Sequence, residues 1–159
     1  MKKHPKRFVL IGVFLIWYYF SLPKPLFDDP TATVLETRSG ELLGAKIAKD
    51  GQWRFPETDS VSKKFEHCIL AFEDQQFYNH FGFNPVSMVE AVSENIKAGK
   101  IVRGGSTITQ QVIRLARKGK KRTYFEKLIE LVLATRLEFE ASKKAVSYTH
   151  LTLPTIYSV

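Results

Sequence analysis

The sequence predicts a mainly helical domain with a small β hairpin, preceded by an N-terminal transmembrane helix. Three observations lead to this prediction. An uncharged apolar run follows a basic N-terminus, strand and turn signals come next, and apolar residues then recur at spacings of three and four after Pro56. The 159 residues correspond to about one domain. A single cysteine, Cys68, excludes an intramolecular disulfide, and with four histidines it excludes a structural zinc site.

The N-terminus has the pattern of an uncleaved signal anchor. Residues 1–7 carry four basic side chains and are expected in the cytoplasm, whereas residues 8–22 carry no charge and are expected to span the inner membrane once. This run is shorter than the roughly 20 residues usual for a span. A cleaved signal peptide and a buried core helix are the alternatives, but no small-x-small cleavage site precedes Pro23. The rest of the chain should therefore lie on the periplasmic or extracellular side.

Residues 33–56 are predicted to form a β hairpin region. Thr33–Arg38 is rich in β-branched residues, and Ser39-Gly40 is a turn signal. Glu41–Ala48 is a second strand-like stretch that ends at another turn signal, Asp50-Gly51.

Four helices are predicted in residues 57–145. Helical spacing places Val61, Phe65, Cys68, Ile69 and Phe72 on one face of the first helix, and Met88, Val89, Val92 and Ile96 on one face of the second. The first helix is expected to begin at Asp59 or Ser60, and the second to begin at Asn84-Pro85 and end at Gly99. The third is expected to begin at Ser106 and to be closed by Gly119. Thr123 and Glu126 form a capping box for the fourth, which covers about 124–141.

Residues 146–159 break the helical pattern. They read VSYTHLTLPTIYSV and carry no charge. We interpret them as a non-native tail translated from a sequencing adapter and leave them out of the fold prediction; a native strand is the alternative. On this interpretation the chain is an N-terminal fragment of a longer protein.

The first stretch with chemical potential reads EDQQFYNHFG, from Glu73 to Gly82. An acidic pair ends an apolar helix beside aromatic residues. A carboxyl group against apolar surface has a raised pKa and can exchange protons near neutral pH. Glu73 is therefore a candidate acid or base, and a solvated helix end is the alternative.

The second stretch reads GGSTITQQ, from Gly104 to Gln111. Glycines before a helix, with hydroxyls and amides in its first turn, favour binding of an anion or a sugar phosphate. An ordinary serine cap is the alternative. Residues 97–122 carry nine basic side chains and no acidic one, which favours the phosphate ligand.

The third stretch reads LIELVL and contains Glu130, an acid within an apolar helix. Such an acid is costly unless it is paired, and Lys127 lies three residues earlier on the same face. We therefore predict a Lys127–Glu130 pair, which is either functional or purely structural.

Together the three stretches resemble glycosyltransferase family 51, the peptidoglycan glycosyltransferase domain of class A penicillin-binding proteins. The motifs are E-D-x-x-F-x-x-H-x-G, G-G-S-T-x-T-Q-Q and K-x-x-E, in that order. The stretches DGQWR at 50–54 and QVIRL at 111–115 are most similar to the 1C type. The resemblance covers about residues 8–145 and implies a lysozyme-like helical domain. The later motifs of the family and a transpeptidase domain are absent from the sequence.

The resemblance implies polymerisation of lipid II into β-1,4 glycan strands, with release of lipid pyrophosphate, in cell-wall synthesis. Glu73 would be the catalytic base, and Glu130 would orient the pocket, with a divalent cation such as Mg or Mn as the one cofactor suggested. The implied substrate contacts are Asp74, Phe77, His80, Ser106, Thr107, Gln110, Gln111, Arg114, Arg122 and Lys127. Glu126 stands where the family has an arginine, so one pyrophosphate contact is not carried over.

The implied partners are lipid II, the growing glycan strand, the membrane and other cell-wall synthesis proteins. A lysozyme-like or lytic glycan-cleaving enzyme is the main alternative, because it also uses a helix-end glutamate, as a general acid. Such an enzyme needs neither the basic stretch nor a membrane anchor. A nucleic-acid-binding module is disfavoured because the anchor places the basic stretch outside the cytoplasm and few aromatic residues interleave it.

Overall fold

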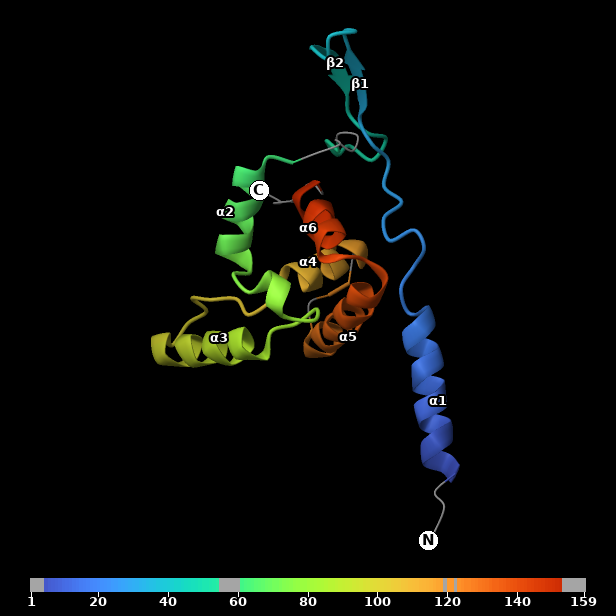
Figure 1. Ribbon diagram of the computed structural model, residues 1–159, viewed down its shortest axis with the longest axis vertical. Helices are drawn as coiled ribbons and strands as arrows, with labels where there is room; N and C mark the ends of the chain where they lie inside the picture. The colour runs from blue at the N-terminus through green and yellow to red at the C-terminus, as the bar shows by residue number, and fades with distance from the viewer. Residues whose placement is uncertain (1–4, 55–60, 119, 122, 153–159) are drawn as a thin grey trace.

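A computed structural model describes residues 5–54, 61–118, 120–121 and 123–152 of the chain. This part is mainly helical and contains a two-stranded hairpin, which confirms the predicted class (Figure 1). The lysozyme-like assignment stays a prediction. The elements are α1 (Pro5–Phe20), β1 (Thr33–Glu36), β2 (Leu42–Lys46), α2 (Lys63–Glu73), a 3₁₀ turn (Phe77–Asn79), α3 (Pro85–Ala98), α4 (Ile108–Ala116), α5 (Tyr124–Glu140) and α6 (Lys143–Thr152).

The hairpin forms within the predicted region. Strands β1 and β2 pair antiparallel, with Thr33 opposite Lys46, and the register shifts after Leu35. Gly40 has a φ of 85° in the connecting turn, a conformation that glycine adopts at little cost. The hairpin stands away from the helices at one end of the molecule (Figure 1).

Helix α4 lies at the centre of the core. Its residues Ile108, Val112 and Ile113 are each 1% exposed. They belong to one apolar cluster with Leu70 of α2, Phe77 of the 3₁₀ turn, and Leu133, Ala134 and Leu137 of α5. This arrangement brings the end of α2 and the start of α4 together.

Local capping fixes the predicted starts of α3 and α5. The Asn84 side chain accepts a hydrogen bond from the backbone N–H of Ser87, and Gly99 ends α3 in the left-handed conformation. The Thr123 side chain accepts from the backbone N–H of Glu126. These boundaries confirm the sequence prediction, because each depends on residues within a few positions of one another.

The apolar faces predicted for the first two helices are not their buried faces. Phe72 of α2 is 86% exposed and Ile96 of α3 is 75% exposed, whereas the buried residues are Leu70 and Ala91. Each helix contacts the core through a narrow strip, so helical spacing alone does not identify the packed side. Helix α2 begins at Lys63 after Ser62, and the predicted caps Asp59 and Ser60 lie outside the described residues.

The predicted transmembrane helix is not supported. Within the described residues, no helix combines the length and the apolar character needed to cross a bilayer. Helix α1 has 16 residues, fewer than the roughly 20 of a typical span. Its C-terminal end contacts α5, where the Tyr18 hydroxyl lies 3.0 Å from the Thr135 hydroxyl. Its apolar side chains are otherwise largely exposed.

The predicted break of the helical pattern at Val146 is wrong. Residues Lys143–Thr152 form α6, which packs against α4. Val146 is 2% and Ser147 1% exposed, because both lie on the face of α6 toward the core. That residues 146–159 are a non-native tail stays a prediction, and residues 153–159 lie outside the described part.

Candidate active site

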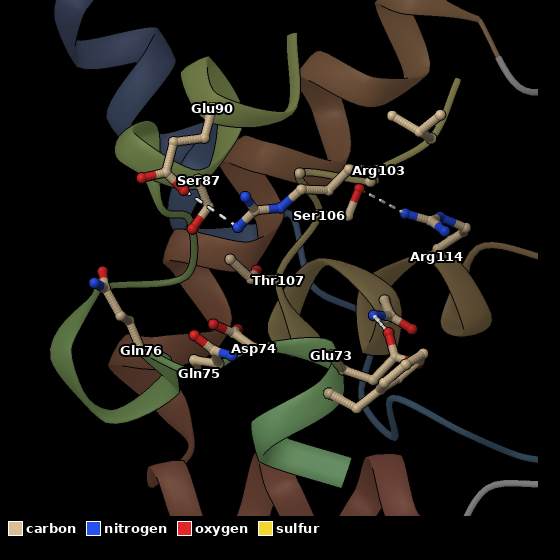
Figure 2. Close-up of a pocket in the computed structure, with 15 residues that line it drawn as sticks. Glu73, Asp74, Gln75, Gln76, Ser87, Glu90, Arg103, Ser106, Thr107 and Arg114 are labelled. Carbon is tan, nitrogen blue, oxygen red and sulfur yellow. Dashed lines mark hydrogen bonds and ion pairs between the residues drawn. The ribbon is translucent and has the colours of Figure 1, made fainter. Parts of the chain in front are cut away.

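A pocket of about 770 Å³ lies between the end of α2, the loop before α4, and α3 (Figure 2). Six residues predicted from the sequence line it: Glu73, Asp74, Ser106, Thr107, Gln111 and Arg114. The first two and the last four come from separate stretches of the sequence, which the shared apolar core and the hydrogen bonds of Glu73 and Asp74 to α4 bring together.

Glu73 is the last residue of α2 and is half-buried at the pocket wall. The side-chain amide of Gln111 on α4 donates a hydrogen bond to its Oε2 at 3.0 Å (Figure 2). His150 Nε2 lies 3.3 Å from the side-chain Oε1 of Gln111. Burial lowers the pKa of this imidazole, and the negative charge of Glu73 opposes that shift with a smaller effect. The carboxylate is therefore fixed in direction and open to the pocket.

Arg114 links the pocket to the buried acid Glu130. Its Nε donates to the Glu130 carboxylate at 3.3 Å, and its Nη2 donates to the Ser106 hydroxyl at 3.2 Å. Glu130 is 7% exposed. The predicted pairing of Glu130 with Lys127 is wrong, because α4 places an arginine across from Glu130 while Lys127 points to the exposed side of α5.

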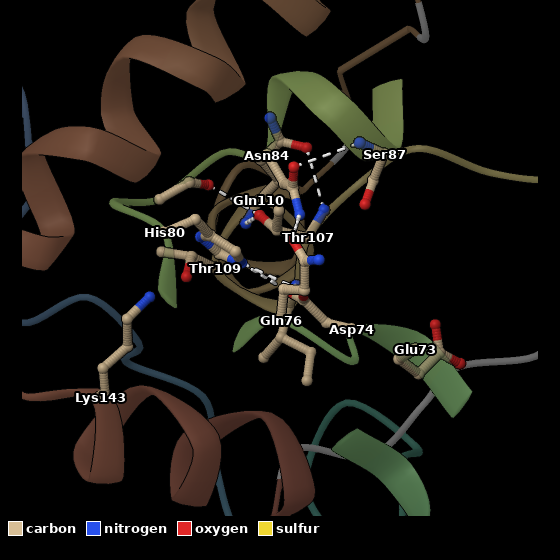
Figure 3. Close-up of polar contacts among 12 residues, drawn as sticks. Glu73, Asp74, Gln76, His80, Asn84, Ser87, Thr107, Thr109, Gln110 and Lys143 are labelled. Atoms are coloured by element: carbon tan, nitrogen blue, oxygen red, sulfur yellow. Dashed lines mark hydrogen bonds and ion pairs between the residues drawn. The ribbon is translucent and has the colours of Figure 1, made fainter. Parts of the chain in front are cut away.

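Asp74 faces inward, although it also lines the pocket. Its Oδ2 accepts hydrogen bonds from the backbone N–H of Ile108 at 3.1 Å and from His80 Nε2 at 2.9 Å (Figure 3). The end of α2 is thus joined directly to the first turn of α4. The sequence predicted free N–H groups for an anion at this helix start, but Asp74 already occupies the first of them.

Thr107 caps α4 with a reciprocal capping box. Its hydroxyl accepts from the backbone N–H of Gln110, and the Gln110 side chain accepts from the backbone N–H of Thr107. The same hydroxyl donates to the carbonyl of Gly82 at 2.7 Å. We predicted Ser106 as the helix start, whereas the T-x-x-Q spacing of a capping box identifies Thr107.

The remaining predicted residues lie behind or away from the pocket. Phe77 and Gln110 are 1% and 2% exposed, and the His80 side chain is packed beside Asp74. Arg122 lies outside the described residues. Arg103 is not among the predicted site residues, yet it lines the pocket and pairs with Glu90 of α3 at 3.2 Å (Figure 2). Its position just before the two glycines of the second stretch was the available signal.

The side chains present do not fit a protein-bound divalent cation. Among the described residues, no three histidine, cysteine, aspartate or glutamate side chains come together as a set of metal ligands. Glu130 faces the Arg114 guanidinium, whose charge opposes a cation at that point.

Residues 40–153 match the family model described as transglycosylase. The chain is 38% identical over 151 residues to penicillin-binding protein 1A of Aquifex aeolicus, covering 91% of this chain and 20% of that protein. It is 34% identical to penicillin-binding protein 1C of Escherichia coli, covering 78% of this chain and 16% of the relative.

A third relative is much shorter than these two. The biosynthetic peptidoglycan transglycosylase of Ralstonia nicotianae is 30% identical, over 76% of this chain and 52% of its own length. The chain therefore spans a fifth or less of the two penicillin-binding proteins and about half of the third relative. The resemblance to glycosyltransferase family 51 is confirmed, because the family match takes in all three motif stretches. Since that match also spans well over half of the chain, the chain belongs to the transglycosylase family.

Proposed function

We propose that this chain is the glycosyltransferase part of a peptidoglycan-synthesising enzyme, which polymerises lipid II into β-1,4 glycan strands and releases lipid pyrophosphate. One observation carries the proposal: a fixed carboxylate, Glu73, and a guanidinium, Arg114, line the same pocket. The first suits a general base and the second suits a phosphate-bearing substrate. The names of the relatives, peptidoglycan transglycosylase and penicillin-binding protein, support the same reaction.

In this proposal Glu73 removes the proton from the 4-hydroxyl of the acceptor sugar. The oxygen attacks the anomeric carbon of the donor sugar, the bond to the lipid pyrophosphate breaks, and the configuration at that carbon is inverted. Pyrophosphate leaves as an anion, so the developing negative charge is the main quantity to stabilise. Arg114 supplies a positive charge, and the Ser106 hydroxyl and Glu130 hold its guanidinium in place.

In this proposal the other motif residues act indirectly, by holding in place the elements that carry the pocket residues. Asp74 and Thr107 at the pocket wall, with His80 and Gln110 behind them, form a hydrogen-bonded support (Figure 3). The predicted substrate contacts at Phe77, His80 and Gln110 are therefore proposed to be indirect. Lys127 and Arg122 stay predicted pyrophosphate contacts.

A glycan-cleaving enzyme of lysozyme type is the second candidate, and the contacts of Glu73 argue against it. Gln111 donates to this carboxylate, which is the arrangement that a base needs, whereas a general acid must present its own proton. Arg103 and Arg114 also line the pocket. A neutral glycan chain carries no anionic group for these cations to bind.

We also propose that residues 1–22 hold the chain at the inner membrane, with the pocket outside the cytoplasm. The apolar side chains of α1 are exposed on all sides, among them Phe8 at 74% and Phe20 at 75%. Helix α3 also carries exposed apolar side chains, among them Val89 at 70% and Ile96 at 75%. Exposed apolar surface of this extent is typical of membrane or protein contacts.

The test replaces Glu73 by glutamine, which keeps the shape and removes the base. The chain is purified in detergent, and lipid II polymerisation is followed by gel together with lipid II binding. We expect polymerisation to fall by roughly 10²–10⁴-fold, the usual contribution of a general base, with binding nearly unchanged. Glu36→Gln, at an exposed position of the hairpin, is the matched control. Polymerisation by Glu73→Gln at the parent rate would show that Glu73 is not the base.

A further inference from the structure

The loop between α3 and α4, residues 99–107, forms one wall of the pocket. We call it the pocket loop. A single side chain of α3 holds its middle: Asn95 Oδ1 accepts from the backbone N–H groups of Val102 at 2.7 Å and Arg103 at 3.0 Å. Asn95 Nδ2 donates to the carbonyl of Arg103 at 3.0 Å. One amide group thus satisfies three backbone groups of the pocket loop, as a neighbouring strand would.

The pocket loop also contacts α3 through charged groups. Arg103 Nη1 donates to Glu94 at 2.8 Å, and Nη2 lies 3.2 Å from Glu90. These three side chains are 41–51% exposed. Ion pairs with this exposure contribute little and are screened by salt. The hydrogen bonds of Asn95 involve no formal charge, so they are the contacts that persist at high ionic strength.

The pocket loop lies directly on α3 beyond Arg103. A Cβ atom at Gly105 would lie 2.9 Å from the Cα of Met88, a distance that leaves no room for a side chain. At the end of the loop, the Thr107 hydroxyl is bound to Gly82. The segment between these fixed points carries Ser106, whose hydroxyl accepts from Arg114. The position of the pocket loop therefore contributes, together with the glutamate partners, to where both arginines of the pocket present their guanidinium groups.

We propose that Asn95 is a positioning residue for binding of the lipid pyrophosphate substrate, acting through the pocket loop without touching the substrate. Asn95 is not among the residues that line the pocket. Its loss would free the backbone at Val102 and Arg103 and would loosen the pocket wall that carries Arg103 and Ser106, the hydroxyl partner of Arg114. The identity of the substrate, a lipid pyrophosphate, rests on the proposed function, whereas the role of Asn95 in holding the pocket loop does not.

The experiment compares Asn95→Ala, Asn95→Asp and the parent chain. Asn95→Asp keeps the two accepted bonds and loses the donated one. Asn79→Ala, at an exposed asparagine of the 3₁₀ turn, is the matched control. The first measurement is the rate of trypsin cleavage after Arg103, identified by mass spectrometry, at low and at high salt. The second is the dissociation constant for lipid II, and the third is the melting temperature.

We expect Asn95→Ala to be cleaved at Arg103 about tenfold faster and to bind lipid II about tenfold more weakly, the effect of losing several modest hydrogen bonds. Asn95→Asp should fall between Asn95→Ala and the parent, and Asn79→Ala should match the parent. The melting temperature should change little, because the pocket loop lies outside the apolar core. Protection of the parent at Arg103 should survive high salt.

Cleavage of Asn95→Ala at the parent rate would show that Asn95 does not hold the pocket loop. Loss of the parent's protection at high salt would do the same, because it would assign the loop to the ion pairs of Arg103. Faster cleavage with parent affinity for lipid II would overturn the positioning role. If the parent itself does not bind lipid II, the proposed function and the positioning role both fail, while the cleavage rates still decide whether Asn95 holds the loop.

Discussion

Two arginine–glutamate pairs join α4 to α5, and they differ in their relation to the pocket. Arg114 pairs with Glu130 and lines the pocket. Arg117, about one helical turn further along the chain, pairs with Glu126, and neither residue of this second pair lines the pocket. Replacing each glutamate by glutamine keeps its shape and removes its charge. The comparison therefore separates the cost of losing an ion pair from the cost of releasing Arg114.

The expected cost in stability is similar for the two variants. A hydrogen bond to a charged group contributes about 1.5–3 kcal/mol. The Arg114 side chain is 36% exposed and its Nε lies 3.3 Å and 3.4 Å from the two Glu130 oxygens, so the contribution lies at the low end. The Arg117 and Glu126 side chains are also partly exposed, at 27% and 12%. We expect each variant to lose about 1–2 kcal/mol of unfolding free energy.

The expected effects on lipid II binding differ. Glu130→Gln removes the carboxylate that holds the Arg114 guanidinium. A loss of about 1.4 kcal/mol in the contact between Arg114 and the substrate weakens lipid II binding about tenfold. Glu126→Gln leaves the pocket intact and should bind as the parent does. Urea unfolding and a lipid II binding titration measure the two quantities. Equal affinities for the two variants would refute the assignment of Arg114 to the substrate.

Three further predictions concern the fold. Gly82→Ala should cost about 3 kcal/mol in a urea titration, because the φ of 81° and a Cβ placed 2.7 Å from the backbone of α5 both disfavour a side chain; an unchanged midpoint would contradict this. The hydrogen bond from Arg117 lowers the pKa of Glu126 below its ordinary value of 4.5, so its stabilisation is present above that pH and is lost as the pH falls through the lower folded pKa. The stability difference between the parent and Glu126→Gln should therefore shrink in acid, and a constant difference would argue against it. Truncation after Ala145 removes the buried Val146 and should lower the melting temperature, whereas an unchanged or higher value would support a non-native tail.

The features that the sequence predicted well depend on neighbouring residues. Asn84 and Thr123 cap their helices through bonds to residues three positions later, so the letters that make the cap lie together in the sequence. The place of Glu73 at a helix end has the same local origin. Hairpin turns at Gly40 and Gly51 follow from glycine's access to positive φ.

The features that were missed depend on contacts between helices. Lys127 lies within helical reach of Glu130 in the sequence, but the packing of α4 on α5 places Arg114 against the Glu130 carboxylate instead. Asn95 hydrogen-bonds to backbone groups seven and eight positions away, with no motif to mark it. The exposure of the apolar faces of α2 and α3 was missed because helical spacing identifies an apolar face but not the element that packs against it.

The link from Asp74 to α4 ties one side of the pocket more closely to the apolar core than the other. Asp74 follows Glu73 directly and is bonded to the first residue of α4, so the proposed base and its partner Gln111 move as one body with the core. The opposite wall is held to α3 by one asparagine, by exposed ion pairs and by the close packing of Gly105 on Met88. In the proposed reaction a long polymer advances by one unit after each bond is formed, and this asymmetry would let the wall at α3 move with the polymer while Glu73 and Gln111 keep the same relative position.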